Sequence, residues 1–130
     1  MNKAIRSFKD LIVWKKAFDL SCDVYKTTKL LPKEELYGLV SQVRRSAISI
    51  PSNIAEGQQR HNTKEFTQFI GISKGSAAEL ETQLLIIQQV YGLEVGKHLE
   101  ELVEIQKMLH FLSKKLATNH SALTTGSASV

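Results

Sequence analysis

The chain contains one cysteine, two prolines and no long hydrophobic run in its 130 residues. The single thiol, Cys22, excludes an internal disulfide and any metal cluster that needs several cysteines. No apolar run approaches the ~18 residues that a membrane-spanning helix requires, so we expect no membrane association. The first residues include lysine and arginine, but no apolar segment follows them. We therefore expect no secretory signal and a cytoplasmic location.

Catalytic and metal-binding patterns are also missing. The hydroxyls between residues 46 and 52 have no histidine within helical reach, and no phosphate-binding glycine loop or nucleophile elbow is present. A di-iron bundle needs Glu-x-x-His pairs. No acid lies three residues before any of the four histidines, which are His61, His98, His110 and His120. We therefore predict no enzymatic activity, no catalytic residue, no metal site and no cofactor.

Positive charge is concentrated in the first half of the chain. The net charge is +4, and residues 1–64 hold twelve Lys or Arg against six Asp or Glu, whereas the remainder holds five against seven. Such a distribution favours a polyanionic partner such as RNA or DNA. An excess of this size is equally consistent with good solubility alone.

Four helix-length hydrophobic patterns follow one another, and no alternating pattern is long enough for a strand. The sequence therefore predicts an all-α protein. Because the connections are short, sequential helices must be antiparallel, which gives an up-down-up-down four-helix bundle formed by residues 1–117. The tail, 118–130, is small and polar, and we expect it to be disordered. The expected helices cover about 10–29, 33–56, 62–91 and 95–117.

Several residues mark the expected helix ends. Gly57 is a candidate left-handed stop for the second helix, and Gly92 for the third. Asn62, followed three residues later by Glu65, predicts a capping box at the start of the third helix. The small side chains between residues 71 and 78 predict a close approach by a neighbouring helix.

The second expected helix contains a proline within its apolar pattern. Apolar residues recur at helical spacing through Ala47, Ile50 and Ile54, but Pro51 cannot donate to the carbonyl of Ala47. Its ring also presses on that turn, at a cost of ~3 kcal/mol unless something compensates. We expect the amide of Asn53 to satisfy the open carbonyl and the helix to be kinked there.

Four cations near this helix are the candidate nucleic-acid-binding residues: Arg44, Arg45, Arg60 and Lys64. Basic side chains in such a group could contact phosphates. For Arg44 and Arg45 we favour a structural role instead, paired with Glu56 or with acids of the last two helices. A carboxylate in the last helical turn needs such a cation because it faces the negative end of the helix dipole. For Arg60 and Lys64, phosphate binding and simple solvation remain equal alternatives.

The apolar surface exceeds what one bundle core can bury. The first helix carries two apolar stripes, and Leu84–Ile87 is apolar on all sides. Surplus apolar faces usually contact another subunit. The sequence therefore predicts self-association.

Several segments together resemble a known family. They are residues 8–17 (FKDLIVWKKA), 37–57 with its SIPSNIAEG ending, 64–66 (KEF) and 79–84 (ELETQL). Across about residues 8–117 the chain resembles the four-helix-bundle proteins encoded in intervening sequences of bacterial 23S ribosomal RNA genes. That family also includes the accessory variability protein of diversity-generating retroelements. Pro51, Asn53, Glu56 and Gly57 form the structural motif within the match.

The resemblance implies a left-handed bundle that assembles into a ring-shaped homopentamer without enzymatic activity. In the retroelement branch, a basic surface is thought to bind nucleic acid and a reverse transcriptase. We therefore predict a homo-oligomer that binds RNA or a ribonucleoprotein through phosphates, with little sequence preference. The alternative is a protein-interaction scaffold, such as an accessory subunit for a reverse transcriptase.

Overall fold

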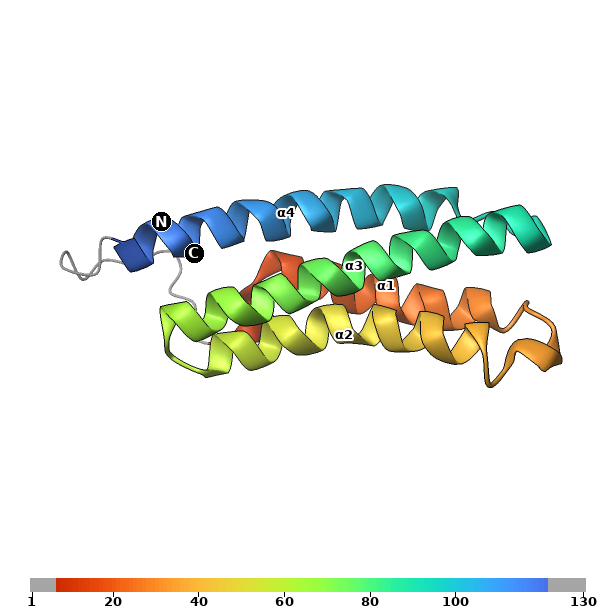
Figure 1. Ribbon diagram of the computed structural model, residues 1–130, viewed down its shortest axis with the longest axis horizontal. Helices are drawn as coiled ribbons and strands as arrows, with labels where there is room; N and C mark the ends of the chain where they lie inside the picture. The colour runs from red at the N-terminus through yellow and green to blue at the C-terminus, as the bar shows by residue number, and fades with distance from the viewer. Residues whose placement is uncertain (1–6, 122–130) are drawn as a thin grey trace.

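The computed structural model describes residues 7–121, which form an antiparallel four-helix bundle (Figure 1). Between residues 7 and 121 there is no strand, so the all-α prediction is confirmed. Two short 3-10 helices, η1 (Phe8–Asp10) and η2 (Lys33–Glu35), precede the first and second long helices. The long helices are α1 (Ile12–Thr28), α2 (Leu39–Gln59), α3 (Thr63–Tyr91) and α4 (Gly96–Ser121).

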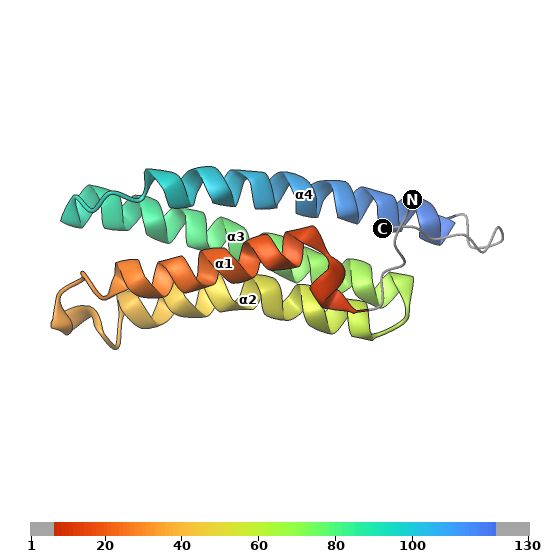
Figure 2. The same ribbon diagram turned by 180° about the vertical axis from the view of Figure 1, so that it is seen from behind.

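Each long helix packs against the next one in the chain, and α1 also packs against α4, which closes the bundle (Figures 1 and 2). The core is lined by apolar side chains spaced three or four residues apart, the spacing that keeps them on one helix face. On α1, Val13, Ala17, Leu20 and Val24 are buried. The other predicted stripe on this helix keeps its aromatic rings partly at the surface. The largest fully buried side chains of the other helices include Val43, Ile50, Ile54, Ile70, Leu80, Leu84, Ile87, Leu102, Ile105 and Leu109.

Two of the predicted helix ends are confirmed. The Asn62 side chain accepts a hydrogen bond of 2.9 Å from the Glu65 amide, which is the N-cap half of the predicted capping box, and Gly92 ends α3 with a φ of 66°. The other ends differ by a few residues. Residues 33–35 form the separate helix η2, and α4 continues to Ser121, so that 118–121 of the expected tail are helical. The rest of that tail lies outside the described residues.

The prediction that Gly57 stops the second helix is wrong. Gly57 lies inside α2, which continues to Gln59, and the residue with a positive φ is His61, at 55°. Gly57 is instead a close-packing position. A Cβ atom there would lie 2.7 Å from the Cβ of Phe69 and 2.9 Å from Cδ1 of Phe66. The missing side chain thus lets α2 and α3 approach closely.

The predicted close approach along residues 71–78 is only partly found. Ser76 and Ala77 are buried inside the bundle. Gly71 and Gly75, however, face outward, and a Cβ atom at either position would meet nothing within 4 Å. The helix pair that these two glycines predicted is therefore not formed within one chain.

Candidate nucleic-acid interface

The carbonyl left open by Pro51 is satisfied by a neighbouring helix. The Ser21 hydroxyl on α1 lies 2.8 Å from the Ala47 oxygen and 2.9 Å from the Ala17 oxygen. A hydroxyl has one proton to donate. Because the Ala17 oxygen already accepts the amide four residues later, the Ala47 oxygen is the acceptor that needs the proton. With this support α2 runs through the buried Pro51 without interruption.

Asn53 does not satisfy the Ala47 carbonyl, so that prediction is wrong. Its amide nitrogen donates to the Ser49 oxygen at 2.8 Å and to the Ser49 hydroxyl at 2.9 Å. Ser49 in turn lies 2.7 Å from the Ser76 hydroxyl on α3, and the Ser73 hydroxyl donates to the Ile50 oxygen. The polar groups around the proline therefore join three helices, and their hydroxyls are occupied by structural hydrogen bonds.

Arg44 has the predicted structural role, but with partners that contain no acid. Its Nε donates to the Thr28 hydroxyl at 2.8 Å, and Nη2 donates to the Tyr25 oxygen at 3.3 Å. The guanidinium also lies 4.5 Å from the centre of the Tyr25 ring. These partners belong to the last turn of α1, whose carbonyl end favours a cation. Arg44 therefore links α2 to the end of α1.

The other three candidates are at the surface. Arg45 and Lys64 are exposed, and neither has a hydrogen bond or ion pair with the part of the chain that the structure describes. Arg60 lies 3.6 Å from a carboxylate oxygen of Glu56 and 5.0 Å from the centre of the Phe69 ring. Glu56 thus pairs with Arg60, one turn away, rather than with Arg44 or Arg45. Because both partners are about half exposed, this ion pair stabilises the fold little.

The candidates form two groups rather than one site. Arg60, which directly follows α2, is fifteen positions after Arg45, which corresponds to about 22 Å along the helix axis at ~1.5 Å per residue. Arg60 and Lys64 flank the turn between α2 and α3, whereas Arg44 and Arg45 lie in the second turn of α2.

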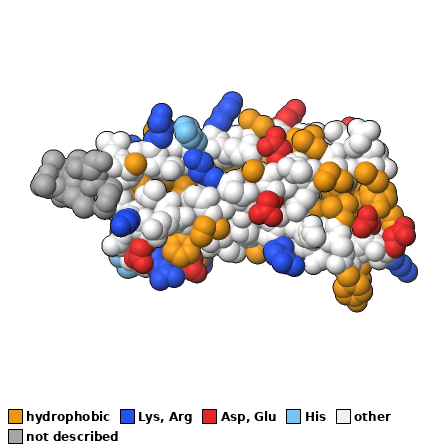
Figure 3. All heavy atoms as spheres, viewed as in Figure 1, with side chains coloured by type: hydrophobic (Ala, Val, Ile, Leu, Met, Phe, Trp, Pro, Cys, Tyr) orange, Lys and Arg blue, Asp and Glu red, His pale blue; other side chains and the backbone are white. Residues whose placement is uncertain are grey.

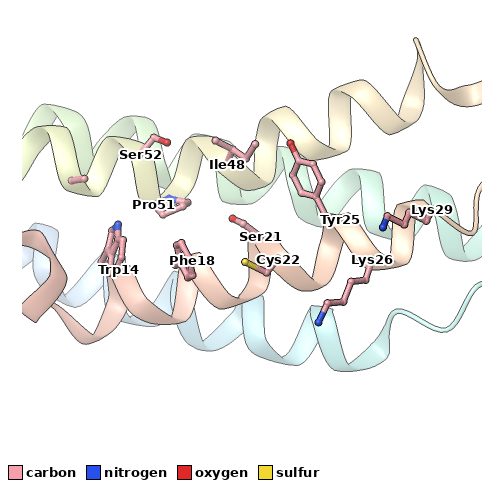
Figure 4. A pocket seen from close by; sticks show the side chains of 11 residues that line it. Trp14, Phe18, Ser21, Cys22, Tyr25, Lys26, Lys29, Ile48, Pro51 and Ser52 are labelled. Atoms are coloured by element: carbon pink, nitrogen blue, oxygen red, sulfur yellow. The ribbon is translucent and has the colours of Figure 1, made fainter.

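Arg44 and Arg45 line a groove of about 720 Å³, which continues into a second hollow of about 630 Å³ between α1 and α2 (Figure 4). We call the two together the α1–α2 groove. Tyr25, Ile48 and Ser52 line both parts, and no Asp or Glu lines either. The lining also includes Lys29 in the part between α1 and α2, and Tyr37 and Asn53 in the part that holds Arg44 and Arg45.

Sequence reasoning missed Tyr25, Lys29 and Tyr37, which belong to other segments of the chain. Figure 4 shows Tyr25 extending from α1 toward α2, with Lys29 one turn further along, while Lys26 points away from α2. The one sequence feature that could have indicated a binding site is an aromatic residue in a short connection, Tyr37 before α2, which the structure shows to be exposed.

Tyr91 connects the far end of α3 to the segment before α2. Its hydroxyl donates to Glu35 at 2.5 Å, and this hydrogen bond raises the pKa of Tyr91 to about 12. The hydrogen bond is the largest cause of this rise, and burial and the charges of Glu35 and Glu34 are its smaller causes. The phenol is therefore protonated across the physiological pH range and acts as a structural donor.

The family model of the 23S rRNA-intervening sequence proteins matches residues 9–111, which include α1, α2, α3 and most of α4. The chain belongs to this family. Among curated proteins, none matches this family member significantly. None of the helices in the described part of the chain is both long and apolar enough to cross a membrane. Within residues 7–121, no group of three or more His, Cys, Asp or Glu side chains could hold a metal ion.

Proposed function

We propose that this member of the 23S rRNA-intervening sequence family is a cytoplasmic, non-enzymatic homopentamer that binds RNA or a ribonucleoprotein with little sequence preference. The observation that supports RNA binding is the position of the basic side chains at the surface and in the α1–α2 groove. Within residues 7–121, Arg45 and Lys64 have no acidic partner, and the lining of the α1–α2 groove contains basic but no acidic side chains. Unpaired surface cations of this kind contact phosphates and not the base edges, so their binding has little sequence preference.

The outer face of α3 supports the homo-oligomer. Among its exposed residues from Gln68 to Val90, only Glu79 is charged. A helix face in contact with water normally carries several charges. Here Ile72, Ile86 and Val90 are exposed instead, and Figure 3 shows few charged side chains along the band that α3 crosses in Figure 1. Such a face fits a second copy of the chain.

The outward glycines fit the same interface. Gly71 and Gly75 have no neighbour within their own chain, so a helix of another subunit could approach α3 closely there. We expect a mass of about five times the 14.6 kDa chain mass in sedimentation equilibrium. Ile86→Lys should lower this mass, because it places a charge in the face. Ile12→Lys is the matched control, an exposed isoleucine on α1 whose replacement should leave the mass unchanged. A wild-type monomer at micromolar concentration would contradict the assembly.

RNA binding is tested by filter binding with a structured RNA at several salt concentrations. Affinity should fall steeply as salt rises, with the slope of log K against log salt set by the number of phosphates contacted. The double variant Arg45→Glu/Lys64→Glu should weaken binding and flatten that slope. Lys97→Glu, an exposed lysine on α4, is the charge-matched control. An absence of binding even at low salt would reject RNA binding.

One observation favours the alternative, a protein-interaction scaffold. A separate groove of about 470 Å³ lies between the start of α1 and α4. Its apolar lining includes Ile12, Met108 and Phe111, and its charged lining consists of Lys107 and Lys115 on α4 and Asp10 on η1. An apolar groove with two lysines along its α4 side fits an amphipathic helix that carries acidic residues on that flank, such as one from a reverse transcriptase. A partner that stays bound after nuclease treatment, and is lost from Phe111→Glu, would support the scaffold. A partner released by nuclease would support RNA binding.

A further inference from the structure

The α1–α2 groove holds the most exposed large hydrophobic side chain of the described residues. Tyr37 is 92% exposed and lies in the short connection between η2 and α2. It has no hydrogen bond or ring contact with residues 7–121. An aromatic ring held in water by a short connection offers both faces to a ligand at small conformational cost, because a tyrosine side chain has few rotatable bonds.

A second aromatic surface in the same groove is already organised around a cation. The Arg44 guanidinium lies over the Tyr25 ring at 4.5 Å and is held there by its hydrogen bonds to Thr28 and the Tyr25 oxygen. Arg44 thus supplies a flat, fixed positive group. Arg45 beside it has no partner among residues 7–121, so its side chain is free to adjust to a ligand. Lys29 adds a third positive charge from α1.

We propose that the α1–α2 groove binds unpaired nucleotides of RNA or single-stranded DNA, with a base stacked on Tyr37 and phosphates contacted by Arg45 and Lys29. Aromatic platforms combined with a cationic groove are how proteins bind single strands without reading sequence. In a duplex the base faces are already stacked, so only unpaired or displaced bases can use Tyr37. Ser52 and Asn53 line the same groove and supply polar groups at its floor.

The charge of the groove favours this occupant over another subunit. A second copy seated here would have to bury Arg44, Arg45 and Lys29, and the groove provides no acid to pair with them. Burying unpaired cations is strongly unfavourable. Phosphates would neutralise all three. The outer face of α3, where Glu79 is the one charged residue among the exposed positions from Gln68 to Val90, is the better subunit contact, and it leaves the α1–α2 groove accessible.

This inference rests on the proposed RNA binding and adds a site and a preference for unpaired strands. Fluorescence anisotropy with a labelled 12-nucleotide oligouridine and with a 12-base-pair RNA duplex tests it. The oligouridine should bind more tightly at equal salt, and Tyr37→Ala should weaken its binding by about tenfold or more while changing duplex binding little. Tyr37→Phe should bind like the wild type, because stacking needs the ring and not the hydroxyl. Leu30→Ala, an exposed residue in the preceding connection, should also have no effect.

The outcomes separate this proposal from the general one. If structured RNA binds with a steep salt dependence but Tyr37→Ala leaves oligouridine binding unchanged, the stacking site is wrong and RNA binding stands. If the duplex binds as tightly as the oligouridine, the preference for unpaired strands is wrong. If Tyr37→Ala lowers the mass in sedimentation, the groove is a subunit contact and the proposal is overturned. If no RNA binds at low salt, both proposals fail.

Discussion

The hydrogen bond from Ser21 to the Ala47 oxygen predicts an energetic coupling between Ser21 and Pro51. Ser21→Ala removes the proton that satisfies this buried carbonyl, because Pro51 has no amide hydrogen to give it. Leaving a buried acceptor unpaired costs ~1–3 kcal/mol. In a Pro51→Ala background, the new amide at position 51 can donate to the Ala47 oxygen, as in any regular helix. The same Ser21→Ala change should then cost less, by about 1 kcal/mol.

The coupling is measured as a double-mutant cycle on the free energy of unfolding in urea, at one protein concentration because assembly contributes to stability. Ser73→Ala is the matched control. The Ser73 hydroxyl is also buried and donates to a carbonyl of α2, that of Ile50. The Ile50 oxygen keeps the helical amide of Ile54, so Ser73→Ala should cost less than Ser21→Ala in the wild-type background. Equal costs of Ser21→Ala with and without Pro51 would refute the assignment of Ser21 as the compensating donor.

Three further predictions concern other contacts. Gly57→Ala should destabilise the fold by ~1–3 kcal/mol in urea unfolding, because its Cβ would clash with Phe69; an unchanged midpoint would contradict the close packing. Asn62→Ala should cost about 1 kcal/mol through loss of the α3 cap, whereas Asn62→Asp should retain most of it. The pKa of Tyr91 is raised to about 12 by Glu35, so its stabilising effect is full below pH ~10 and is lost as pH rises through about 12. Tyr91→Phe should remove this part of the alkaline loss, and identical pH profiles would refute it.

The features that were predicted correctly depend on local sequence. Helical periodicity identified four helices, and short connections fixed their antiparallel order. Asn62 and Gly92 act within one turn of their own helix ends, so their roles are readable from neighbouring residues. Gly57, like Gly92, follows an apolar helical pattern in the sequence, yet its role is to allow close packing against Phe66 and Phe69 on the next helix. Only the tertiary structure distinguishes a glycine that ends a helix from one that admits a neighbour.

The difference between local sequence and tertiary contacts also explains why the partners of the proline segment and of Arg44 were not predicted. A missing donor at Pro51 was evident from the sequence, but its replacement comes from Ser21, 26 residues before Ala47. Asn53, the nearest polar candidate, bonds within its own turn to Ser49. Arg44 was expected to need a partner, and its partners proved to be uncharged groups at the end of α1. In each case the residue type predicted that a hydrogen-bonding partner was required, while helix packing decided which residue became that partner.

The outer face of α3 is mostly apolar, whereas the α1–α2 groove is basic. Because the two surfaces lie on different parts of the chain, an assembly formed through the first can bind RNA through several copies of the second. One chain presents Arg45 and the Arg60–Lys64 pair about 22 Å apart, too few and too widely spaced for tight phosphate binding by a monomer. Subunits joined through the outer face of α3 would repeat these cations around the assembly without covering the α1–α2 groove. Repetition raises the effective concentration of each further contact once the first is made. An Ile86→Lys variant that sediments as a monomer should therefore bind a long single strand far more weakly than the wild type, while binding an oligonucleotide that reaches only one groove equally well. Equal binding of both ligands by monomer and assembly would show that repetition contributes nothing.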